Sequence, residues 1–229
     1  SDSFWGTPNS IIEKFNQAKI LVVPPFLNLL NDLKNGSKVA KAFDLVYDSE
    51  KEVPLLTPTG GVQQLLPLSN TFPPANRTNC FVIGDLAENR IIIDPSPKDE
   101  EEYIKLLNTI RNMEISSVFL THHHPDHHEF SNNLANSLSI PMKMSEDTHQ
   151  RIINKLGIKY FNEVDVEIVY DGDVITKSGG KDIFLYNVPG HDEGQLGLAP
   201  KTMEWFIVGD LIQTVGTVVI GGDEGDMRK

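Results

Sequence analysis

The stretch that decides the fold reads His122-His123-His124-Pro125-Asp126-His127, one residue after the apolar run 117–120. Five of the chain's seven histidines lie between positions 122 and 128. Imidazole is the commonest metal ligand at neutral pH, and alternate residues of an extended loop point the same way, so we expect His122 and His124 to converge. Asp126 and His127 then turn towards a neighbouring point. A surface histidine tract is the simpler alternative, but the preceding strand and the Pro-Asp interruption favour a loop that holds metal ions.

Three more residues of the kinds that bind metals follow other predicted strands. Asp94 ends the strand 90–93, His191 follows the strand 183–187 within Pro-Gly-His, and Asp210 follows the strand 205–208 within Gly-Asp. Taken singly, an Asp after a strand is more often a turn or cap residue, and a lone His is more often structural. Because strand ends gather into one site in α/β folds, their joint occurrence with the histidine run favours a shared metal site.

The chain divides into two parts. Residues 1–58 predict helices: Ser10 and Glu13 have the spacing of a capping box, Pro24-Pro25 opens a second helix, and a third is expected over 39–43. The stretch 51–61 predicts a linker. Residues 59–229 alternate strands and helices and predict a layered α/β domain with helices outside. Besides the strands named above, we expect strands at 62–66, 80–83, 166–170, 196–199 and 217–220, and helices capped by Ser96 and Ser145 and over 130–138.

Composition narrows the class of protein. The 229 residues suit one large domain or a domain with an extension, and the net charge of −12 counts against broad nucleic-acid binding. No run approaches the ~18 apolar residues of a membrane helix, so no membrane partner is expected. A single cysteine, Cys80, excludes an internal disulfide, and no signal peptide is evident, so a cytoplasmic protein is expected.

Taken together, these motifs resemble the metallo-β-lactamase superfamily over about residues 60–222. The resemblance covers the H-x-H-x-D-H run, Asp94-Pro95, the Pro-Gly-His and the Gly-Asp. It implies an αββα sandwich, to which residues 1–58 add a helical extension. It also implies a metal-dependent hydrolase in which a metal-bound hydroxide is the nucleophile.

The same resemblance implies a role for each site residue. His122, His124 and His191 would hold a first metal, Asp126 and His127 a second, and Asp210 would bridge them. Asp94 would orient the histidine loop from behind the ligands, and Asp126 is the expected catalytic residue. One or two zinc ions are expected because mixed nitrogen and oxygen ligands suit zinc, with iron or manganese as alternatives.

The sequence departs from the family pattern in three places. Glu129 stands where the family usually has Gly. Asp192 and Glu193 stand where a small hydroxyl residue is usual, and these acids should disfavour anionic substrates unless they face away. No histidine follows His191, although the family supplies one more to the second metal. We favour a fragment that lacks the usual C-terminal helix-strand unit. A truly incomplete second site is the alternative, and a homo-oligomer is another source of the missing part.

The substrate class stays open at this point. The segments 209–212 and 216–219 look most like the lactamase-β-like endoribonuclease branch, and the glyoxalase II branch is the first alternative. The expected substrates are therefore a small ester or thioester, or an RNA phosphodiester, and the net charge weighs against RNA. Flavodiiron chemistry is disfavoured because that branch has an acid in place of His124. A non-catalytic or regulatory metal-binding protein is the competing hypothesis.

Overall fold

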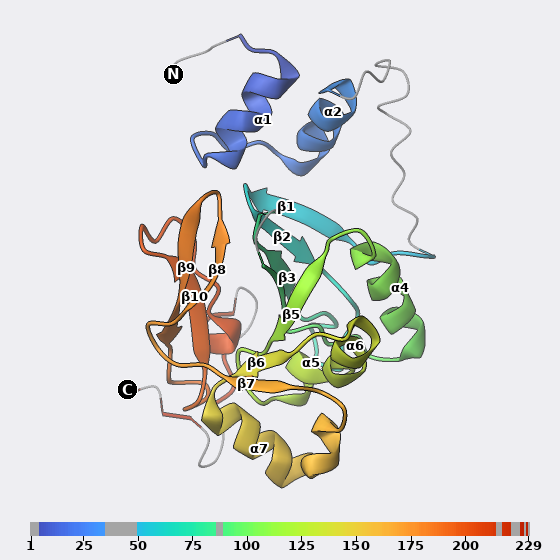
Figure 1. Ribbon diagram of the computed structural model, residues 1–229, viewed down its shortest axis with the longest axis vertical. Helices are drawn as coiled ribbons and strands as arrows, with labels where there is room; N and C mark the ends of the chain where they lie inside the picture. Colours follow the sequence, from blue (N-terminus) through green and yellow to red (C-terminus); the bar gives the residue numbers. More distant parts are fainter. Residues whose placement is uncertain are drawn as a thin grey trace.

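The computed structural model describes residues 5–34, 50–85, 89–213, 217–220, 225, 226 and 228; the helix expected over 39–43 lies outside them. Two sheets and a set of helices make up most of this part of the chain, with the helices α4 and α6 on the side of the larger sheet that faces away from the smaller one (Figure 1). The expected layered α/β arrangement is confirmed. Among the described helices, none is long and apolar enough to cross a membrane.

The larger sheet has seven strands that lie in sequence order. The first four strands pair antiparallel and the last four pair parallel, with β4 common to both sets. Parallel strands end at the same edge of a sheet, so the loops after β4 and β5 meet there. The strands are β1 (Leu55–Thr59), β2 (Val62–Leu65), β3 (Cys80–Ile83), β4 (Arg90–Ile93), β5 (Ile115–Phe119), β6 (Met142–Met144) and β7 (Val166–Ile168).

Helices connect the parallel strands: α4 (Glu100–Ile110), α5 (Pro125–His128), α6 (Ser131–Leu138) and α7 (Glu146–Leu156). Ser145 caps α7 as expected, by accepting a hydrogen bond from the Thr148 amide, and Gly157 ends it. The prediction that Ser96 caps α4 is wrong. Asp99 caps it, and three acidic residues follow in the first turn. The positive end of the helix dipole stabilises their negative charges.

The smaller sheet packs against the larger one. It consists of β8 (Val174–Ser178), β9 (Lys181–Asn187) and β10 (Leu196–Pro200), with β9 in the centre and all pairs antiparallel. Successive residues of β4 alternate between two cores. Ile91 and Ile93 join Leu185 and Leu198 in the core between the sheets. Ile92 faces the helices. Both faces of the central strands are therefore buried, which explains why β4 reads as a continuous apolar run.

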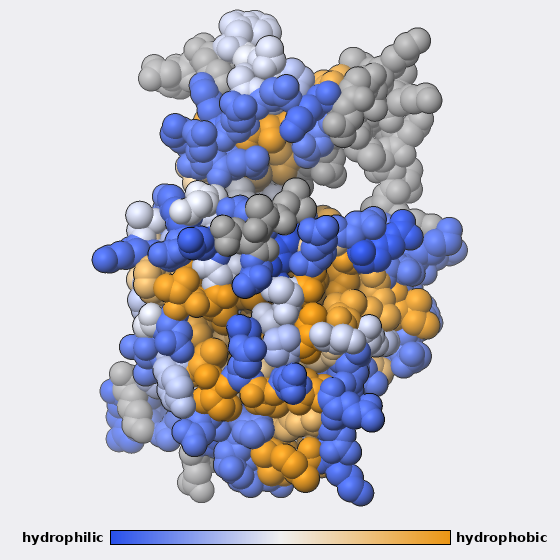
Figure 2. Space-filling view, viewed as in Figure 1, coloured by the Kyte–Doolittle hydropathy of each residue, from blue (hydrophilic) through white to orange (hydrophobic). Residues whose placement is uncertain are grey.

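The N-terminal part forms two helices, α1 (Pro8–Asn16) and α2 (Pro24–Lys34), which lie beyond the end of the sheets (Figure 1). Thr7 caps α1 instead of Ser10, because Pro8 already occupies the first turn. Their contact is a small apolar cluster around Ile12, Phe15 and Leu27, separate from the two cores of the sheets. The outward side of these helices is mostly hydrophilic on the face shown in Figure 2.

Three further expectations need correction. The stretch 51–61 is not a linker throughout, because it contains β1, which lies across the boundary predicted at residue 58. Residues 205–208 do not form a full strand; they are held by one bridge between Ile207 and Leu198. Residues 217–220 form no strand and belong to neither of the two described sheets. Several apolar residues of these two segments, Phe206, Val219 and Ile220, are exposed, so their hydrophobicity did not reflect a buried strand.

Candidate metal centre

The histidine run begins where β5 ends, at the edge shared by the parallel strands (Figure 1). His124 is the N-cap residue of α5, and Pro125 follows in the first turn. Proline suits this position because the first helical amide has no partner inside the helix. The short helix returns the chain, so that the rings of His122 and His127 lie 4.1 Å apart between centroids.

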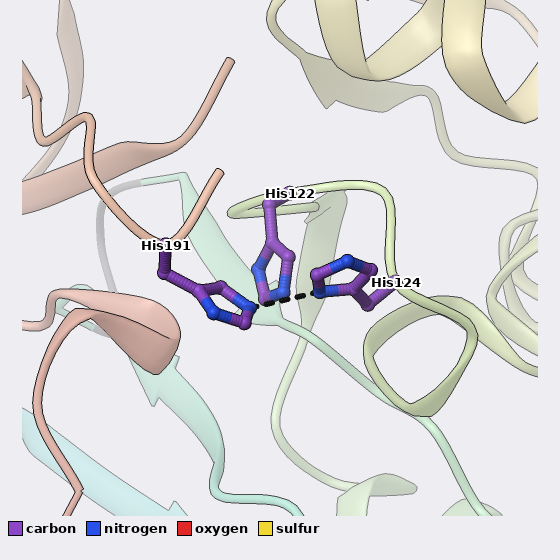
Figure 3. A group of neighbouring side chains, drawn as sticks. All are labelled: His122, His124 and His191. Atoms are coloured by element: carbon purple, nitrogen blue, oxygen red, sulfur yellow. Dashed lines mark hydrogen bonds between the residues drawn. The ribbon is translucent and has the colours of Figure 1, made fainter. Parts of the chain in front are cut away.

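Three imidazoles from two loops converge on one point (Figure 3). His122 and His124 come from the loop after β5, and His191 comes from the loop between β9 and β10. One ring nitrogen from each lies within 4.8 Å of the others. His124 Nδ1 and His191 Nε2 are 2.8 Å apart, so they share one proton in this arrangement. Nε2 of His122 is buried and has no hydrogen-bond partner among the described residues.

A second group shares His122 with the first. His122, His127 and Asp210 each offer a ligand atom within 4.8 Å of the others. His127 Nε2 faces Asp210 Oδ1 at 3.3 Å, and this nitrogen is buried without hydrogen-bond geometry to any described residue. A neutral ring nitrogen and a carboxylate oxygen both present lone pairs, so a proton or a metal cation would stabilise their contact.

Asp94 holds the histidine loop from behind. Its carboxylate accepts hydrogen bonds from the Thr121 amide at 2.8 Å, the Thr121 hydroxyl at 2.6 Å and His127 Nδ1 at 2.9 Å. The Thr121 hydroxyl in turn lies 3.0 Å from His122 Nδ1. Because the hydroxyl proton goes to Asp94, His122 Nδ1 must donate to Thr121. Both rings therefore carry a proton on Nδ1, so Nε2 is the atom of each ring that is available to a metal.

The electrostatics of the second group also favour a cation. Burial, then the neighbouring imidazoles, hold the pKa of His122 well below its usual value, so this ring is neutral. Burial alone would lower the pKa of His127, but Asp94 and Asp210 outweigh it and raise that pKa well above its usual value. Burial would raise the pKa of Asp210, yet His127 and the other imidazoles lower it. Ionised Asp210 and a proton-seeking His127 thus fit a divalent metal ion.

The C-terminal segment fixes the third histidine. His191 Nδ1 lies 2.7 Å from the carbonyl oxygen of Val219, so Nδ1 donates there and Nε2 faces His124. Gly225 comes so close to the carbonyls of Gly190 and His191 that a Cβ atom would collide with them. The sequence offered no signal for this contact, because a backbone carbonyl acts as the partner.

Two acidic residues lie next to the histidines in sequence, Asp126 and Asp192, but neither belongs to the two ligand groups described above. Asp126 is half-buried in α5 and belongs to none of the three ligand groups formed by described residues. Asp192 is fully buried, and its Oδ2 lies 2.5 Å from His123 Nδ1. Asp192 therefore meets the exception stated for these acids: its carboxylate faces His123 and not the solvent, so it gives no reason to disfavour anionic substrates. Glu193 is exposed.

The pair also belongs to a third group of three ligand-type residues, His123, His124 and Asp192. In this third group the Lys155 ammonium already supplies a positive charge. Lys155 Nζ donates to His123 Nε2 at 3.1 Å, so His123 Nδ1 carries the proton that faces Asp192. A metal ion would have to displace that proton beside an ammonium group, so this group does not suit one.

A cavity of about 290 Å³ opens beside the histidine loop. Pro125, Phe130, Leu156 and Tyr160 give it apolar walls, and Lys98 and Lys155 add two ammonium groups. Glu129, which stands where the family usually has Gly, lines the same cavity and accepts a hydrogen bond from Asn70 at 2.8 Å. The cavity therefore offers a small apolar space with positive charge at its wall.

Comparisons with known proteins agree with this geometry. The sequence model described as the metallo-beta-lactamase superfamily matches residues 73–228. An uncharacterized protein of Aquifex aeolicus (strain VF5) is 28% identical over 143 residues, which cover 58% of this chain and 65% of that protein. A hydroxyacylglutathione hydrolase of Wigglesworthia glossinidia brevipalpis is 29% identical over 131 residues, which cover 56% and 44%. The chain thus spans less than two thirds of the length of either relative.

Solved structures show the same fold at low identity. A beta-lactamase domain protein from Burkholderia ambifaria superposes with a TM-score of 0.61 and 15% identity, over 78% of this chain and 61% of that one. A metallo-beta-lactamase from Pontibacter korlensis gives a TM-score of 0.58 and 16% identity, over 77% and 80%. The expected sandwich fold is therefore confirmed.

Proposed function

The chain belongs to the metallo-β-lactamase superfamily, and we propose that it is a metal-dependent hydrolase that cleaves a small ester or thioester. One observation carries the proposal: His122, His124 and His191 converge from two loops, with His127 and Asp210 beside them. Three imidazoles held in this way are typical of hydrolytic zinc sites. The buried Nε2 atoms of His122 and His127, which have no hydrogen-bond partner among the described residues, point to the same use, since a ligand nitrogen must offer its lone pair to the metal.

We assign the ligands in two sets. His122, His124 and His191 would hold a first ion, and His127 and Asp210 would contribute to a second. Zinc is the proposed metal because nitrogen-rich sets with a carboxylate suit it, and iron or manganese are the alternatives to test. When bound, such ions lower the pKa of water and polarise the bond under attack.

The chain's own groups prepare this site. Asp94 and Thr121 hold His127 and His122 with their protons on Nδ1. Val219 does the same for His191 through its carbonyl oxygen. The rings are thereby oriented before a metal arrives, and burial of His122 and His127 keeps bulk water away from their Nε2 atoms.

Two observations favour an acyl substrate over RNA. One relative is named as a hydrolase of hydroxyacylglutathione, which is a thioester. The net charge of −12 disfavours approach of a phosphate backbone. A phosphodiester is the alternative substrate, and a non-catalytic metal-binding protein is the alternative function.

Metal titration and a substrate panel test the proposal together. The purified protein is stripped with a chelator, reloaded with zinc, manganese or iron, and assayed on an α-hydroxyacyl glutathione thioester, an aryl ester, an aryl phosphodiester and a β-lactam. We expect metal-dependent turnover of the thioester or the ester. His122→Ala should lose both metal and turnover, whereas His149→Gln, which changes a histidine of α7 outside the site, should keep both.

The outcomes separate the hypotheses. Phosphodiester turnover alone would contradict the acyl substrate. A metal-loaded protein that turns over none of the four substrates would favour the non-catalytic alternative.

Asp126 needs its own test. We propose it as a ligand of the second metal and as a catalytic residue because of its place in the H-x-H-x-D-H run. Asp126→Ala should then lower the metal content per chain and reduce turnover. If metal occupancy and turnover both survive this substitution, the assignment of Asp126 is wrong.

A further inference from the structure

Two residues that lie between or beside the proposed ligands face each other in the protein interior. His123 stands between His122 and His124 in one loop, and Asp192 directly follows His191 in the other. Both side chains are fully buried, and His123 Nδ1 lies 2.5 Å from Asp192 Oδ2. The two loops that supply the first ligand group are thus joined by one short contact.

The contact is supported at both ends. Lys155, near the end of α7, donates to His123 Nε2 at 3.1 Å, which orients the ring with its proton towards Asp192. The other carboxylate oxygen of Asp192 accepts a hydrogen bond from the Gly194 amide at 2.8 Å. The two outer atoms of the contact, His123 Nε2 and Asp192 Oδ1, are therefore hydrogen-bonded, and the two inner atoms form an ion-pair contact. A buried charge needs such a partner of opposite charge to be stable.

Helix α7 closes the set of contacts. Ser145, its N-cap residue, donates to the carbonyl oxygen of Gly194 at 2.8 Å. Lys155 lies about 15 Å further along the helix, at 1.5 Å per residue. The chain of contacts runs from Ser145 through the 191–195 loop and His123 to Lys155. A rigid helix thus touches both ligand loops, one at each end.

We propose that His123 and Asp192 are positioning residues, whose buried contact sets the spacing between the loop of His122 and His124 and the loop of His191. The inference rests on the proposed metal-dependent function and adds a specific cause for the geometry of the first ligand group. Neighbours that orient metal ligands commonly change metal affinity 10- to 100-fold when they are replaced, so a loss of about that size is expected here.

The variants are chosen in matched pairs. Asp192→Asn keeps the shape and removes the charge, whereas Glu193→Gln removes the same charge from the exposed neighbouring residue. His123→Ala removes the contact, whereas His123→Asn keeps a nitrogen donor near the position of Nδ1. We expect zinc affinity, measured by competition with a chromophoric chelator, to fall about 10- to 100-fold in Asp192→Asn and His123→Ala. Glu193→Gln should match the wild type, and His123→Asn should recover part of the loss.

Two spectroscopic measurements separate positioning from general stability. In the metal-free protein, the His123 Nδ1 proton should resonate far downfield in proton NMR, because it lies in a short contact with a carboxylate. That signal should vanish in Asp192→Asn and persist in Glu193→Gln. With cobalt at saturation, the visible spectrum of Asp192→Asn should shift while its near-ultraviolet circular dichroism stays as in the wild type.

The results can overturn the inference without touching the proposed function. A folded Asp192→Asn with wild-type zinc affinity and an unchanged cobalt spectrum shows that the pair does not position the ligands. If Asp192→Asn fails to fold, the comparison of His123→Ala with His123→Asn decides in the same way. A wild-type protein that binds no metal overturns the proposed function and this inference together.

Discussion

Asp94 is the residue on which the orientation of the second ligand group depends. It is 2% exposed and accepts three hydrogen bonds, two from Thr121 and one from His127. A buried carboxylate is costly unless such bonds compensate for lost water, so its position right after β4 is structurally specific. Its charge also raises the pKa of His127, against the opposing effect of burial. The Asp94 side chain thus fixes a proton on Nδ1 of His127, orients the ring of His127 and places a negative charge beside it.

Replacing Asp94 should therefore damage the site more than the fold around it. Asp94→Ala is expected to weaken zinc binding about 10- to 100-fold, because His127 and His122 lose the partner that fixes their protons on Nδ1. Isothermal titration with zinc measures this change. Asp99→Ala, which removes the half-exposed cap of α4 and leaves the site intact, is the matched control. Equal zinc affinity in Asp94→Ala and the wild type would show that Asp94 does not support the metal site.

His128 makes the metal-free protein sensitive to acid. Burial lowers the pKa of this ring to about 4, against hydrogen bonds to the carbonyls of His128 and His123 that oppose the shift. A folded-state pKa below the unfolded value of about 6.5 gives stability that is present above pH 6.5 and lost as the pH falls towards 4. The lowered pKa of His122 acts in the same direction.

The expected loss from His128 alone is on the order of 3 kcal/mol between pH 6.5 and 4. Urea unfolding of the metal-free protein at several pH values measures it. His128→Gln should show a shallower decline over this range than the wild type, and His149→Gln should follow the wild type. Identical declines in all three proteins would contradict the assignment. The raised pKa of His127 acts above pH 6.5 and so leaves this window unaffected.

At the scale of elements, the sequence predicted those whose signals are local. The run 117–120 and the Ser145 and Gly157 caps identified β5 and α7 because burial on both faces and capping leave clear patterns. β1 was read as a linker because it contains Pro58, which an edge strand tolerates since one side of its backbone is unpaired. β8 was missed because its only two apolar residues, Val174 and Ile175, are adjacent and residues 176–178 are polar, so no apolar alternation is visible.

The residues of the site divide in the same way, into those that a local sequence pattern predicts and those that only the fold brings together. The motif positions of His122, His124, His127, His191 and Asp210 were accessible from the sequence, and the structure brings these five together. The contact between His123 and Asp192 joins residues from distant parts of the chain. The bond from His191 to Val219 uses a carbonyl that any residue supplies. Neither has a local pattern, so neither could be predicted without the fold.

The N-terminal helices are an element whose stability can be separated from the site. Phe15 is 1% exposed within the small cluster that joins α1 and α2. Phe15→Ala should cost about 3–5 kcal/mol in that cluster, because it leaves a cavity. Hydrogen exchange should show faster opening of both helices with unchanged zinc affinity. Phe26→Ala, at a position that is 61% exposed, is the control. A loss of zinc binding in Phe15→Ala would mean that the helices support the site.

At the scale of the whole molecule, the proposed metal ions would connect the two sheets. His122, His124 and His127 follow β5 of the larger sheet, whereas His191 precedes β10 of the smaller one. An ion held by both sets would resist their separation. Free zinc at about 1,000 times its dissociation constant should add about 4 kcal/mol to the free energy of unfolding, and a chelator should remove it. Zinc without effect on urea unfolding would contradict a folded-state metal site.

Cys80 gives the molecule a built-in reporter of this coupling. The thiol lies in β3 with no exposed surface, and burial, aided by the nearby Asp94 carboxylate, raises its pKa well above the usual value. Disulfide-exchange reagents attack thiolates, so the native protein should be inert to them until the larger sheet opens. Because the chain has one cysteine, every labelling event counts an opening of β3 and nothing else. The labelling rate of the unmodified protein therefore measures how often β3 opens under native conditions.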